Sequence, residues 1–457
     1  MLPKVVIIGN GITGITVARY LRKYFSQIPI KIISKEYPYF FSRTALMYVY
    51  MGHMQYKDLE PYERWFWKKN HFDLIYNEVT YIDFTKKEIY FKDNSKEDYD
   101  ILILATGSKP NKFGWPGQDL NRVQGLYSLQ DLQNLEQYTK EGIKKAVIVG
   151  GGLIGIELAE MFHSKKIPVT FLVRETSFWN IVLPEEESQI VNQEILKHHI
   201  DLRLSTELKE ITGDENNNAN GVFTNKNEFI PCNFVGLTAG VSPNIDFLKN
   251  TFLETNRGIL INRFFETNIK DVYAAGDCAE FKEVYGNERP IEQLWYTGKL
   301  QGMALAGILI QRIAKKYEYN IPKSIDRQFE ERYLKKEQPY NRGIWFNSAK
   351  FFTIEYQTYG YVPNKPQNTF IWHNPKKNIF FRIVWEKLNN DTKITGLNLL
   401  NLRFRHEVCE QWIKEERSIN YVIDHLKEAF FNPEFYYNPV KDIQKQFYHN
   451  QTKGVLT

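Results

Sequence analysis

A glycine-rich turn that occurs twice constrains the fold more than any other feature of this sequence. The first copy lies in residues 5–14, VVIIGNGITG, where an apolar strand leads into Gly9, Gly11 and Gly14 in the spacing GxGxxG and a helical segment follows. In such a turn the first glycine allows a tight bend and the second lets the backbone approach a pyrophosphate. The third lets the helix pack on the strand, so that its N-terminus faces the phosphates. The pattern predicts a dinucleotide-binding unit.

A second copy of the turn indicates that the chain binds two dinucleotides. After the first copy, the strand IKIIS ends close to Glu36, where a carboxylate can accept hydrogen bonds from a ribose diol. The second copy, AVIVGGGLIGIELAEMF, supplies Gly150, Gly152 and Gly155, and the strand VTFLVRE follows it. The natural chemical pairing is a flavin that receives hydride from a nicotinamide. The alternative is two structural glycine turns in unrelated helical layers.

Composition narrows the class of protein and its partners. The 457 residues are enough for about three domains. The net charge is only +5, without a dense run of basic residues, so we expect no nucleic-acid partner. The three cysteines are far apart and form no CxxC, which predicts neither a disulfide framework, a metal site nor an iron–sulfur cluster. The chain opens almost directly on an apolar strand and has no membrane-length apolar segment, so we expect a cytoplasmic protein, either soluble or peripheral at a membrane.

Three further motifs extend the pattern along the chain. They are ILILATGSKPN at residues 101–111, GVSPN at 240–244 and TNIKDVYAAGDCAE at 267–280. Together with the two turns, and in this order, they resemble the FAD-dependent pyridine nucleotide-disulfide oxidoreductase family. The resemblance covers residues 1 to about 310; the remaining residues match only in position and general make-up.

The resemblance implies an α/β fold with two Rossmann-like, glutathione reductase-type domains and a C-terminal α+β interface domain. The expected FAD-binding domain comprises residues 1–112 and 238–325, the NAD(P)H-binding domain residues 113–237, and the interface domain residues 326–457. Alternating apolar and polar residues after residue 326, followed by amphipathic segments, fit a small antiparallel sheet and helices. In this family such a domain either dimerises or covers the flavin, so a homodimer is one expectation.

The resemblance also assigns residues to FAD. Asp277 is expected to bond the ribityl chain, and the helix that begins in EQLWYTGKLQG, residues 292–302, is expected to point its N-terminus at the pyrimidine edge of the flavin. Trp295 and Tyr296 would then be flavin neighbours; ordinary aromatic packing is the alternative. The expected FAD-binding residues are Gly9, Gly11, Ile12, Thr13, Gly14, Glu36, Arg43, Ala105, Thr106, Gly107, Gly276, Asp277, Trp295 and Tyr296.

The strand after the second turn bears on the choice of nicotinamide. In NADH-using members it ends in an acid, whereas here that position is Val173 and Arg174 comes next, as in the NADPH-binding form of the family. A second arginine is missing at Asn180, and Glu175 lies close to where a phosphate would bind, so the pattern favours NADPH over NADH only slightly. The alternative is that Arg174 is a solvated charge. The expected NAD(P)H-binding residues are Gly150, Gly152, Leu153, Ile154, Gly155, Glu157, Arg174 and Gly240.

The segment FFSRTALMYVYMG, residues 40–52, carries the main departure from the family pattern. Peroxide-reducing and coenzyme A disulfide-reducing relatives have a redox cysteine where this chain has Arg43, and no CxxxxC is present. Without a cysteine at this position, no thiol intermediate can form beside the flavin. The segment resembles that of rubredoxin and ferredoxin reductases and of the flavin part of NAD(P)H nitrite reductase. We expect Arg43 and Glu157 to be catalytic and to pair beside flavin N5. The alternative is that Arg43 is a pyrophosphate or surface charge.

These observations predict an FAD-dependent NAD(P)H oxidoreductase. Hydride passes from nicotinamide to FAD N5, and electrons then go directly to an external acceptor, expected to be a small redox protein or redox subunit. The aromatic and basic segment PYERWFWKKN, residues 61–70, either docks an acidic carrier or packs as a helix. The C-terminal aromatic and lysine-rich tail keeps open a type II NADH:quinone-like enzyme in peripheral contact with a membrane. A third alternative is a flavin-bound, NAD(P)H-responsive scaffold or sensor resembling apoptosis-inducing factor.

Overall fold

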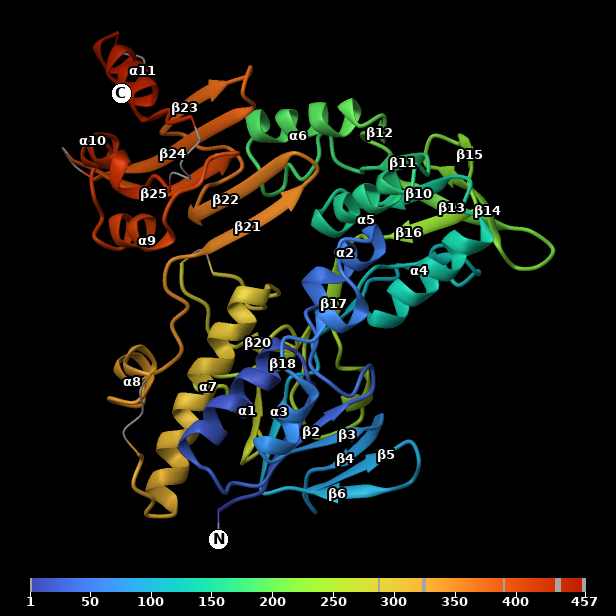
Figure 1. The fold of residues 1–457 in the computed structure, drawn as a ribbon, viewed down its shortest axis with the longest axis vertical. Helices are drawn as coiled ribbons and strands as arrows, with labels where there is room; N and C mark the ends of the chain where they lie inside the picture. Colours follow the sequence, from blue (N-terminus) through green and yellow to red (C-terminus); the bar gives the residue numbers. More distant parts are fainter. Residues whose placement is uncertain (1, 287, 323–325, 389–390, 432–436, 454–457) are drawn as a thin grey trace. The chain divides into compact units, whose positions relative to one another are not determined.

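The chain folds into two compact units, each of which contains one glycine-rich turn (Figure 1). A computed structural model describes residues 2–286, 288–322, 326–388, 391–431 and 437–453. The first unit consists of Met1–Asn111, Gly125–Gly142 and Gly240–Arg342, and the second of Lys112–Gln124, Ile143–Ala239 and Gly343–Thr457. Residues 125–142 thus group with the first turn, and the C-terminal region groups with the second. The three-domain division expected from the sequence stays a prediction.

A five-stranded parallel sheet forms the centre of the first unit. Its strand order is β19-β7-β1-β2-β3. The strands are β1 (Val5–Ile8), β2 (Ile30–Ser34), β3 (Phe72–Tyr76), β7 (Ile101–Leu104) and β19 (Val272–Ala274). The two central strands, VVII and ILIL, are buried along their whole length, as expected for a parallel sheet that is covered on both faces.

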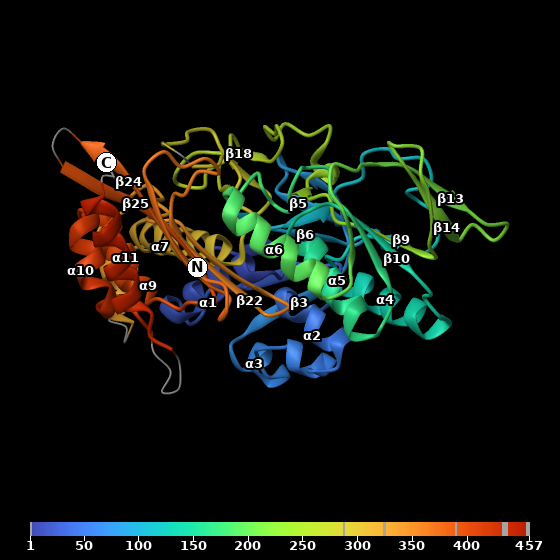
Figure 2. The ribbon, with the colours of Figure 1, turned by 90° about the horizontal axis from the view of Figure 1, so that it is seen from above.

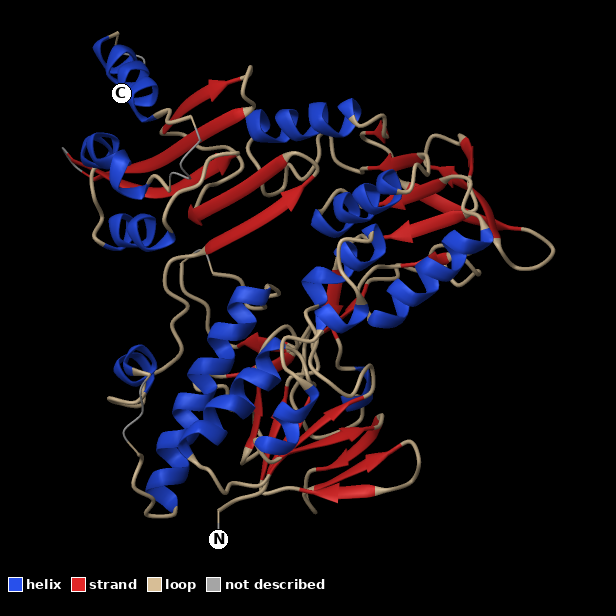
Figure 3. Ribbon diagram, viewed as in Figure 1, coloured by secondary structure: helices blue, strands red, loops and turns tan. Residues whose placement is uncertain are grey.

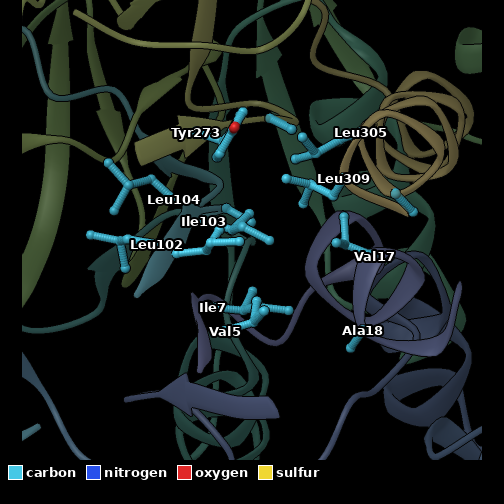
Figure 4. Packing of buried hydrophobic residues seen from close by; sticks show 14 of the residues in the cluster. Val5, Ile7, Val17, Ala18, Leu102, Ile103, Leu104, Tyr273, Leu305 and Leu309 are labelled. Carbon is cyan, nitrogen blue, oxygen red and sulfur yellow. The ribbon is translucent and has the colours of Figure 1, made fainter. Parts of the chain in front are cut away.

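Helices α1 (Ile12–Tyr24) and α7 (Trp295–Lys316) pack on each other and cover one face of this sheet. Figure 4 shows Val17 of α1 and Leu305 and Leu309 of α7 beside side chains of β1 and β7. Helix α7 therefore runs along the helix that follows the first glycine turn. Its N-terminal end is the one that the sequence predicts to lie at the flavin.

Shorter elements complete the first unit (Figure 3). Strands β8 (Ser108–Pro110) and β17 (Val241–Pro243) pair antiparallel, which brings the two predicted crossing segments side by side. The other elements are β4 (Val79–Asp83), β5 (Glu88–Phe91), β6 (Lys96–Asp98), β18 (Ile259–Ile261), β20 (Ala279–Phe281), α2 (Leu46–Met51), α3 (Arg64–Lys69), α4 (Leu129–Glu141) and α8 (Arg327–Tyr333), with 3-10 turns at Arg43–Ala45, Tyr56–Leu59 and Asp246–Leu248.

The second unit repeats the strand–turn–helix arrangement. Its parallel sheet has the order β12-β11-β10-β16-β9. The elements are β9 (Val123–Gln124), β10 (Ala146–Val149), α5 (Leu153–Ser164), β11 (Val169–Leu172), α6 (Glu185–Lys197), β12 (Asp201–Arg203) and β16 (Phe234–Leu237), with an antiparallel sheet of β13 (Leu208–Gly213), β14 (Ala219–Thr224) and β15 (Phe229–Pro231). The predicted pair of Rossmann-like folds is confirmed.

The C-terminal region is α+β, as predicted. An antiparallel sheet of order β21-β22-β25-β24-β23 lies beside three helices (Figure 2). The elements are β21 (Phe346–Phe351), β22 (Ile354–Gly360), β23 (Thr369–Asn374), β24 (Ile379–Leu388), β25 (Asp391–Leu400), α9 (His406–Lys414), α10 (Ile419–Ala429) and α11 (Val440–Thr452). Helix α11 buries Val440, Ile443 and Phe447 in this domain. These three residues of the tail therefore serve the core, whereas Phe431, before the helix, is 53% exposed. Residues 432–436 and 454–457 lie outside the described structure.

A buried ion pair fastens the C-terminal sheet to helix α6. The guanidinium of Arg382, which is 1% exposed, donates from Nε and Nη2 to the two carboxylate oxygens of Glu187 at 2.7 and 2.8 Å. Glu187 is fully buried and also accepts a hydrogen bond from Asn398 at 3.1 Å. Nη2 of Arg382 also pairs with the more exposed Glu186 at 2.5 Å. Removal of Arg382 would therefore leave Glu187 as a buried charge without its cation, whereas removal of Glu187 would leave Arg382 with Glu186.

Candidate functional site

The backbone of the first turn has the shape that a pyrophosphate requires. Gly9 has a φ of +117°, and a Cβ at Gly14 would lie 2.0 Å from the carbonyl oxygen of Gly9. A Cβ at Gly11, in contrast, would meet no atom within 4 Å. The turn is thus tight where the chain bends and packs, and open at the position that faces the expected ligand.

Unused hydrogen-bonding groups gather at the same turn. Helix α1 begins at Gly11 without a side-chain cap, so its first N–H groups are available to an anion. The side chain of Asn10 donates to the carbonyl of Pro38 at 3.0 Å, while its buried Oδ1 has no hydrogen-bond partner among the described residues. Helix α4 differs, because Ser128 and Asp131 close its N-terminus in a capping box. The first turn therefore fits an external dinucleotide.

Three segments predicted to hold FAD converge on this turn. Thr13 donates its hydroxyl to the carbonyl of Gly298 in α7 at 3.0 Å. Gly276 has a φ of +80°, and a Cβ there would lie 2.5 Å from Thr13 Oγ1. Ala105 packs against Gly9 of the turn. A Cβ at Gly9 would lie only 2.0 Å from the Ala105 carbonyl oxygen.

The ATG motif, residues 105–107, leads from β7 into the crossing segment. The hydroxyl of Thr106 donates to the carbonyl of Asn244 at 2.8 Å, and Gly107 has a φ of +70°. Ile12 is half-buried at the start of α1. All these predicted FAD residues belong to the first unit, as does Asp277.

Asp277 lies in a hydrogen-bonded group that the sequence did not predict. Ser108 donates to its Oδ2 at 3.1 Å, and Gln293 donates to the Ser108 hydroxyl at 2.8 Å. Burial raises the pKa of Asp277 to about 6, although the Ser108 hydrogen bond and the charge of Arg43 oppose the shift. The carboxyl is thus half-buried and held in one orientation, as a ligand for a ribityl hydroxyl would be.

Arg43 forms a two-pronged ion pair with Glu36. Its Nη1 and Nη2 donate to the two carboxylate oxygens at 2.9 and 2.6 Å, and Nη1 also donates to the carbonyl of Tyr127. The backbone N–H of Leu129, at the start of α4, donates to Glu36 at 2.8 Å. Because Glu36 is itself a predicted FAD-binding residue, the guanidinium lies among the predicted FAD-binding groups. Its pairing with Glu157 stays a prediction, since Glu157 belongs to the other unit.

Tyr127 is a site residue that sequence reasoning missed. Its ring lies 4.5 Å from the Arg43 guanidinium carbon, and its hydroxyl accepts a hydrogen bond from the N–H of Ser108 at 2.9 Å. Burial raises the pKa of this phenol to about 12. One sequence signal could have indicated its position. The capping sequence SLQD, directly after Tyr127, marks the start of α4, so Tyr127 lies at the end of the preceding loop.

The aromatic pair at the start of α7 is partly open. The Trp295 ring is 36% exposed, lies 5.5 Å from the Tyr296 ring edge to face, and has the Lys299 ammonium 5.5 Å from its centre. Helix α7 has no side-chain cap at Leu294. The predicted flavin contact of Trp295 and Tyr296 stays a prediction.

The second turn repeats the geometry of the first. Gly150 also has a φ of +117°, a Cβ at Gly155 would lie 2.4 Å from the Gly150 carbonyl oxygen, and a Cβ at Gly152 would meet no atom within 4 Å. Helix α5 begins at Gly152 without a side-chain cap, with Leu153 and Ile154 half-buried in its first turn. Gly240 lies in the first unit, where its carbonyl accepts a hydrogen bond from the N–H of Asn111 at 3.1 Å.

The end of β11 presents an exposed ion pair. Arg174 has a side chain that is 69% exposed, and it donates from Nε and Nη2 to one oxygen of Glu175 at 3.2 and 2.9 Å. Val173, where NADH-using members carry the acid, is fully buried. Asn180 donates to the hydroxyl of Thr176 at 3.0 Å. The guanidinium of Arg174 is therefore accessible, but a carboxylate already occupies it.

Glu157 is half-buried in α5, within the second unit. Burial raises its pKa to about 7, and the neighbouring charge of Glu160 adds to the shift. A carboxyl with such a pKa changes its protonation state near neutral pH, which is a property of groups that handle protons.

All three cysteines are structural. Cys232, Cys278 and Cys409 are buried, and burial raises the pKa of each thiol above its ordinary value. A protonated, inaccessible thiol is a poor nucleophile. Within the described part of the chain, no helix combines the length and apolar character needed to cross a bilayer.

Two glycine-rich turns, with an aspartate and the start of a long helix beside the first, are the arrangement expected of a flavin- and nicotinamide-dependent oxidoreductase. Residues 3–302 match the family model described as pyridine nucleotide-disulphide oxidoreductase, and the chain belongs to this family. Membership confirms the resemblance predicted from the motifs. The chain is accordingly an FAD-dependent NAD(P)H oxidoreductase.

Two relatives and one solved structure show which members of the family this chain is similar to. The chain is 30% identical over 282 residues to an NADH-rubredoxin oxidoreductase of Clostridium acetobutylicum, a match that covers 61% of this chain and 68% of the relative. It is 27% identical over 291 residues to an NAD(P)H nitrite reductase of Bacillus subtilis, covering 63% of this chain but only 36% of that longer protein. A crystal structure of the putidaredoxin reductase–putidaredoxin complex shares the fold, with a TM-score of 0.76 and 19% identity, over 97% of this chain and 98% of that one.

Proposed function

We propose that this enzyme passes electrons from NAD(P)H to a small redox protein or redox subunit without a redox-active cysteine. The observation that carries the proposal is Arg43, which stands where disulfide-reducing relatives have their thiol and which lies among Glu36, Tyr127 and Asp277. The three buried cysteines support it, because none offers an accessible thiolate.

The residues around the first turn have distinct roles in this proposal. FAD, when bound, accepts hydride from a nicotinamide and gives electrons to an acceptor. The uncapped N-terminus of α1 would hold the pyrophosphate, Glu36 the adenosine ribose and Asp277 the ribityl chain. The uncapped start of α7 would place the positive end of its helix dipole where it could stabilise negative charge on the flavin.

Arg43 supplies a positive charge in place of a thiol. In the structure its guanidinium lies against Tyr127 and pairs with Glu36. Because Glu36 is assigned to the adenosine ribose, at the far end of FAD from the reacting ring, Arg43 acts at N5 only if this pair opens when FAD binds. We expect Arg43→Ala to slow reduction of bound FAD by NAD(P)H in stopped-flow mixing, with Arg43→Lys intermediate. FAD content is measured in parallel to separate binding from rate. An unchanged reduction rate at full FAD content would remove Arg43 from the mechanism.

Glu157 is proposed to line the nicotinamide pocket and to control protonation there. With a pKa of about 7, the carboxyl of Glu157 is partly protonated and partly ionised near neutral pH. Pairing with Arg43 in the complete site would stabilise the ionised form and lower that pKa. The pH dependence of the stability of Glu157→Gln distinguishes an unpaired Glu157, whose pKa is raised, from a Glu157 that is paired with Arg43.

NADPH is proposed as the preferred nicotinamide. Arg174 offers an exposed guanidinium that can bind a 2′-phosphate, and the buried Val173 offers no acid for the ribose of NADH. Glu175 competes for the same guanidinium, so the preference is modest. The ratio of kcat/KM for the two nicotinamides measures it directly.

The electron acceptor is proposed to be an acidic redox protein. Relatives include enzymes named for rubredoxin and putidaredoxin. In α3, Trp67 packs into the core, whereas Arg64, Trp65, Lys68 and Lys69 are exposed, with Trp65 at 59%. Lys68→Glu together with Lys69→Glu should lower kcat/KM for an acidic iron–sulfur carrier and leave ferricyanide reduction unchanged; equal activity with the carrier would exclude this docking surface.

The alternatives make different predictions for the same protein. Fast bleaching of the flavin by NAD(P)H with slow reoxidation by air supports a protein acceptor. Fast quinone turnover with membrane sedimentation would support a quinone reductase, although α11 buries its apolar face. Sluggish reduction with a long-lived charge-transfer band would support a sensor. A homodimer through the C-terminal domain stays a prediction for sedimentation analysis.

A further inference from the structure

A buried carboxylate next to α7 connects three separate segments of the first unit. Glu292 is 3% exposed, and its two oxygens accept hydrogen bonds from Tyr340 Oη, Gln301 Nε2 and Arg342 Nη1, each at 3.0 Å. Tyr340 and Arg342 lie where the chain leaves this unit, and Gln301 lies two turns into α7. Sequence reasoning assigned no role to any of these four residues.

Gln301 links this carboxylate to the flavin-binding motif. Its side chain is 1% exposed, and its Oε1 accepts a hydrogen bond from the backbone N–H of Gly276 at 2.7 Å. Glu292 can only accept and the Gly276 N–H can only donate, so the amide of Gln301 has one orientation that satisfies both. Glu292 therefore sets the orientation of Gln301, and Gln301 holds the left-handed turn at Gly276 that precedes Asp277.

The charges of the group are balanced close to the start of α7. The carboxylate of Glu292 lies three residues before Trp295, at the end of the helix whose dipole is positive. The Arg342 guanidinium, with a side chain 12% exposed, neutralises it through the 3.0 Å ion pair. In a buried environment each charge acts strongly on its surroundings, so the balance between the two matters for any charge that forms nearby.

We propose that Glu292 is a positioning residue for FAD and that the Glu292–Arg342 pair sets the reduction potential of the bound flavin. Through Gln301 the carboxylate fixes the turn that presents Asp277 to the ribityl chain. Through its pairing with Arg342 it leaves the N-terminus of α7 free to stabilise the negative charge of the reduced ring. The inference rests on the binding of FAD at the first turn, and it does not depend on the identity of the acceptor.

Single and double substitutions test the charge balance by the midpoint potential of bound FAD. Glu292→Gln leaves the Arg342 charge unbalanced, which favours the reduced, more negative flavin and raises the potential. Arg342→Gln leaves the carboxylate unbalanced and lowers the potential. The double variant returns toward the wild-type potential. Shifts of the same sign in both single variants, or no shift in either, would overturn the proposal.

A third variant tests the positioning role without changing any charge. Gln301→Leu removes the hydrogen bond to the Gly276 N–H, and we expect the dissociation constant of FAD to rise about tenfold, as loss of a buried hydrogen bond predicts. Fluorescence of the released flavin measures this constant. Unchanged FAD affinity in Gln301→Leu would remove the positioning role.

Matched controls come from the other end of the same helix. Arg312 of α7 pairs with Glu266 at 2.5 Å, and neither residue is hydrogen-bonded to the Gly276 turn in the described structure. Glu266→Gln and Arg312→Gln should therefore leave both the potential and FAD affinity at wild-type values, and equal shifts in these controls would overturn the assignment to Glu292. Wild-type protein that binds no FAD would instead refute the proposed function itself.

Discussion

The two glycine turns share one backbone geometry and differ in what surrounds them. Gly9 and Gly150 have the same φ of +117°, and both Gly11 and Gly152 face open space. After the first turn, Glu36 is held by Arg43 and by the start of α4. After the second, Arg174 follows the end of the corresponding strand, and its side chain is 69% exposed.

We propose that this difference distinguishes a retained cofactor at the first turn from an exchanging one at the second. At the first turn, side chains from distant segments enclose the site in a connected set of hydrogen bonds, from Glu36 through Arg43 and Tyr127 to Ser108 and Asp277. Such a preorganised site loses little entropy on binding and holds its ligand tightly. The exposed strand end at the second turn suits a nicotinamide that binds, reacts and leaves.

The largest effect is expected at Gly11. Gly11→Val places a side chain in the open space meant for the pyrophosphate, and we expect FAD affinity to fall by more than about 100-fold, since steric overlap with a ligand costs several kcal/mol. No protein atom lies within 4 Å of the new Cβ, so the apoprotein should keep its fold. Flavin absorbance after purification and circular dichroism measure the two properties. Purification with a full complement of FAD would contradict the assignment of the first turn.

The same change in the second turn should spare the flavin. A Cβ at Gly152 also meets no protein atom within 4 Å. Gly152→Val should therefore retain FAD and raise KM for NAD(P)H by about 10- to 100-fold through overlap with the nicotinamide dinucleotide. Loss of FAD from this variant would show that the two turns have been assigned to the wrong cofactors.

A smaller effect, on the preference for NADPH over NADH, is expected at the exposed Arg174. Arg174→Ala should lower kcat/KM for NADPH about tenfold, because one charge-assisted contact to the 2′-phosphate is lost, and should leave NADH unchanged. Glu175→Gln, the matched partner, should raise kcat/KM for NADPH by freeing the guanidinium. Equal losses with both nicotinamides in Arg174→Ala would mean that Arg174 does not contact the 2′-phosphate.

A last effect concerns the pH dependence of the stability contributed by Glu157. Its pKa is raised from 4.5 to about 7, so the folded chain binds a proton more tightly than the unfolded chain. Stability is therefore lost as pH rises from about 4.5 to about 7, and relative to wild type Glu157→Gln should gain about 3 kcal/mol of stability between pH 4 and pH 8. Thermal unfolding at both pH values measures the difference. A difference independent of pH would indicate a cation beside Glu157, such as the predicted Arg43.

Local patterns were predictable from the sequence, and long-range contacts were not. The strand–turn–helix units and the C-terminal α+β region follow from glycine spacing, apolar runs and resemblance, which are properties of short segments. Tyr127, Ser108 and Gln301 act through partners far away in the chain; Ser108 and Asp277, for example, are 169 residues apart. The buried Arg382–Glu187 pair joins positions 195 residues apart, and neither residue stands in a recognisable motif. Such pairs depend on tertiary packing that no single segment encodes.

The central claim is that the flavin is the last redox group within this chain. Anaerobic titration of the FAD-loaded protein with NADPH tests it most directly, with flavin absorbance followed to its end point. A chain without a redox-active thiol should bleach completely at one equivalent of NADPH per FAD, and free-thiol content should be the same before and after. Uptake of a second equivalent, with new thiols released, would reveal a disulfide that accepts electrons and would contradict the account.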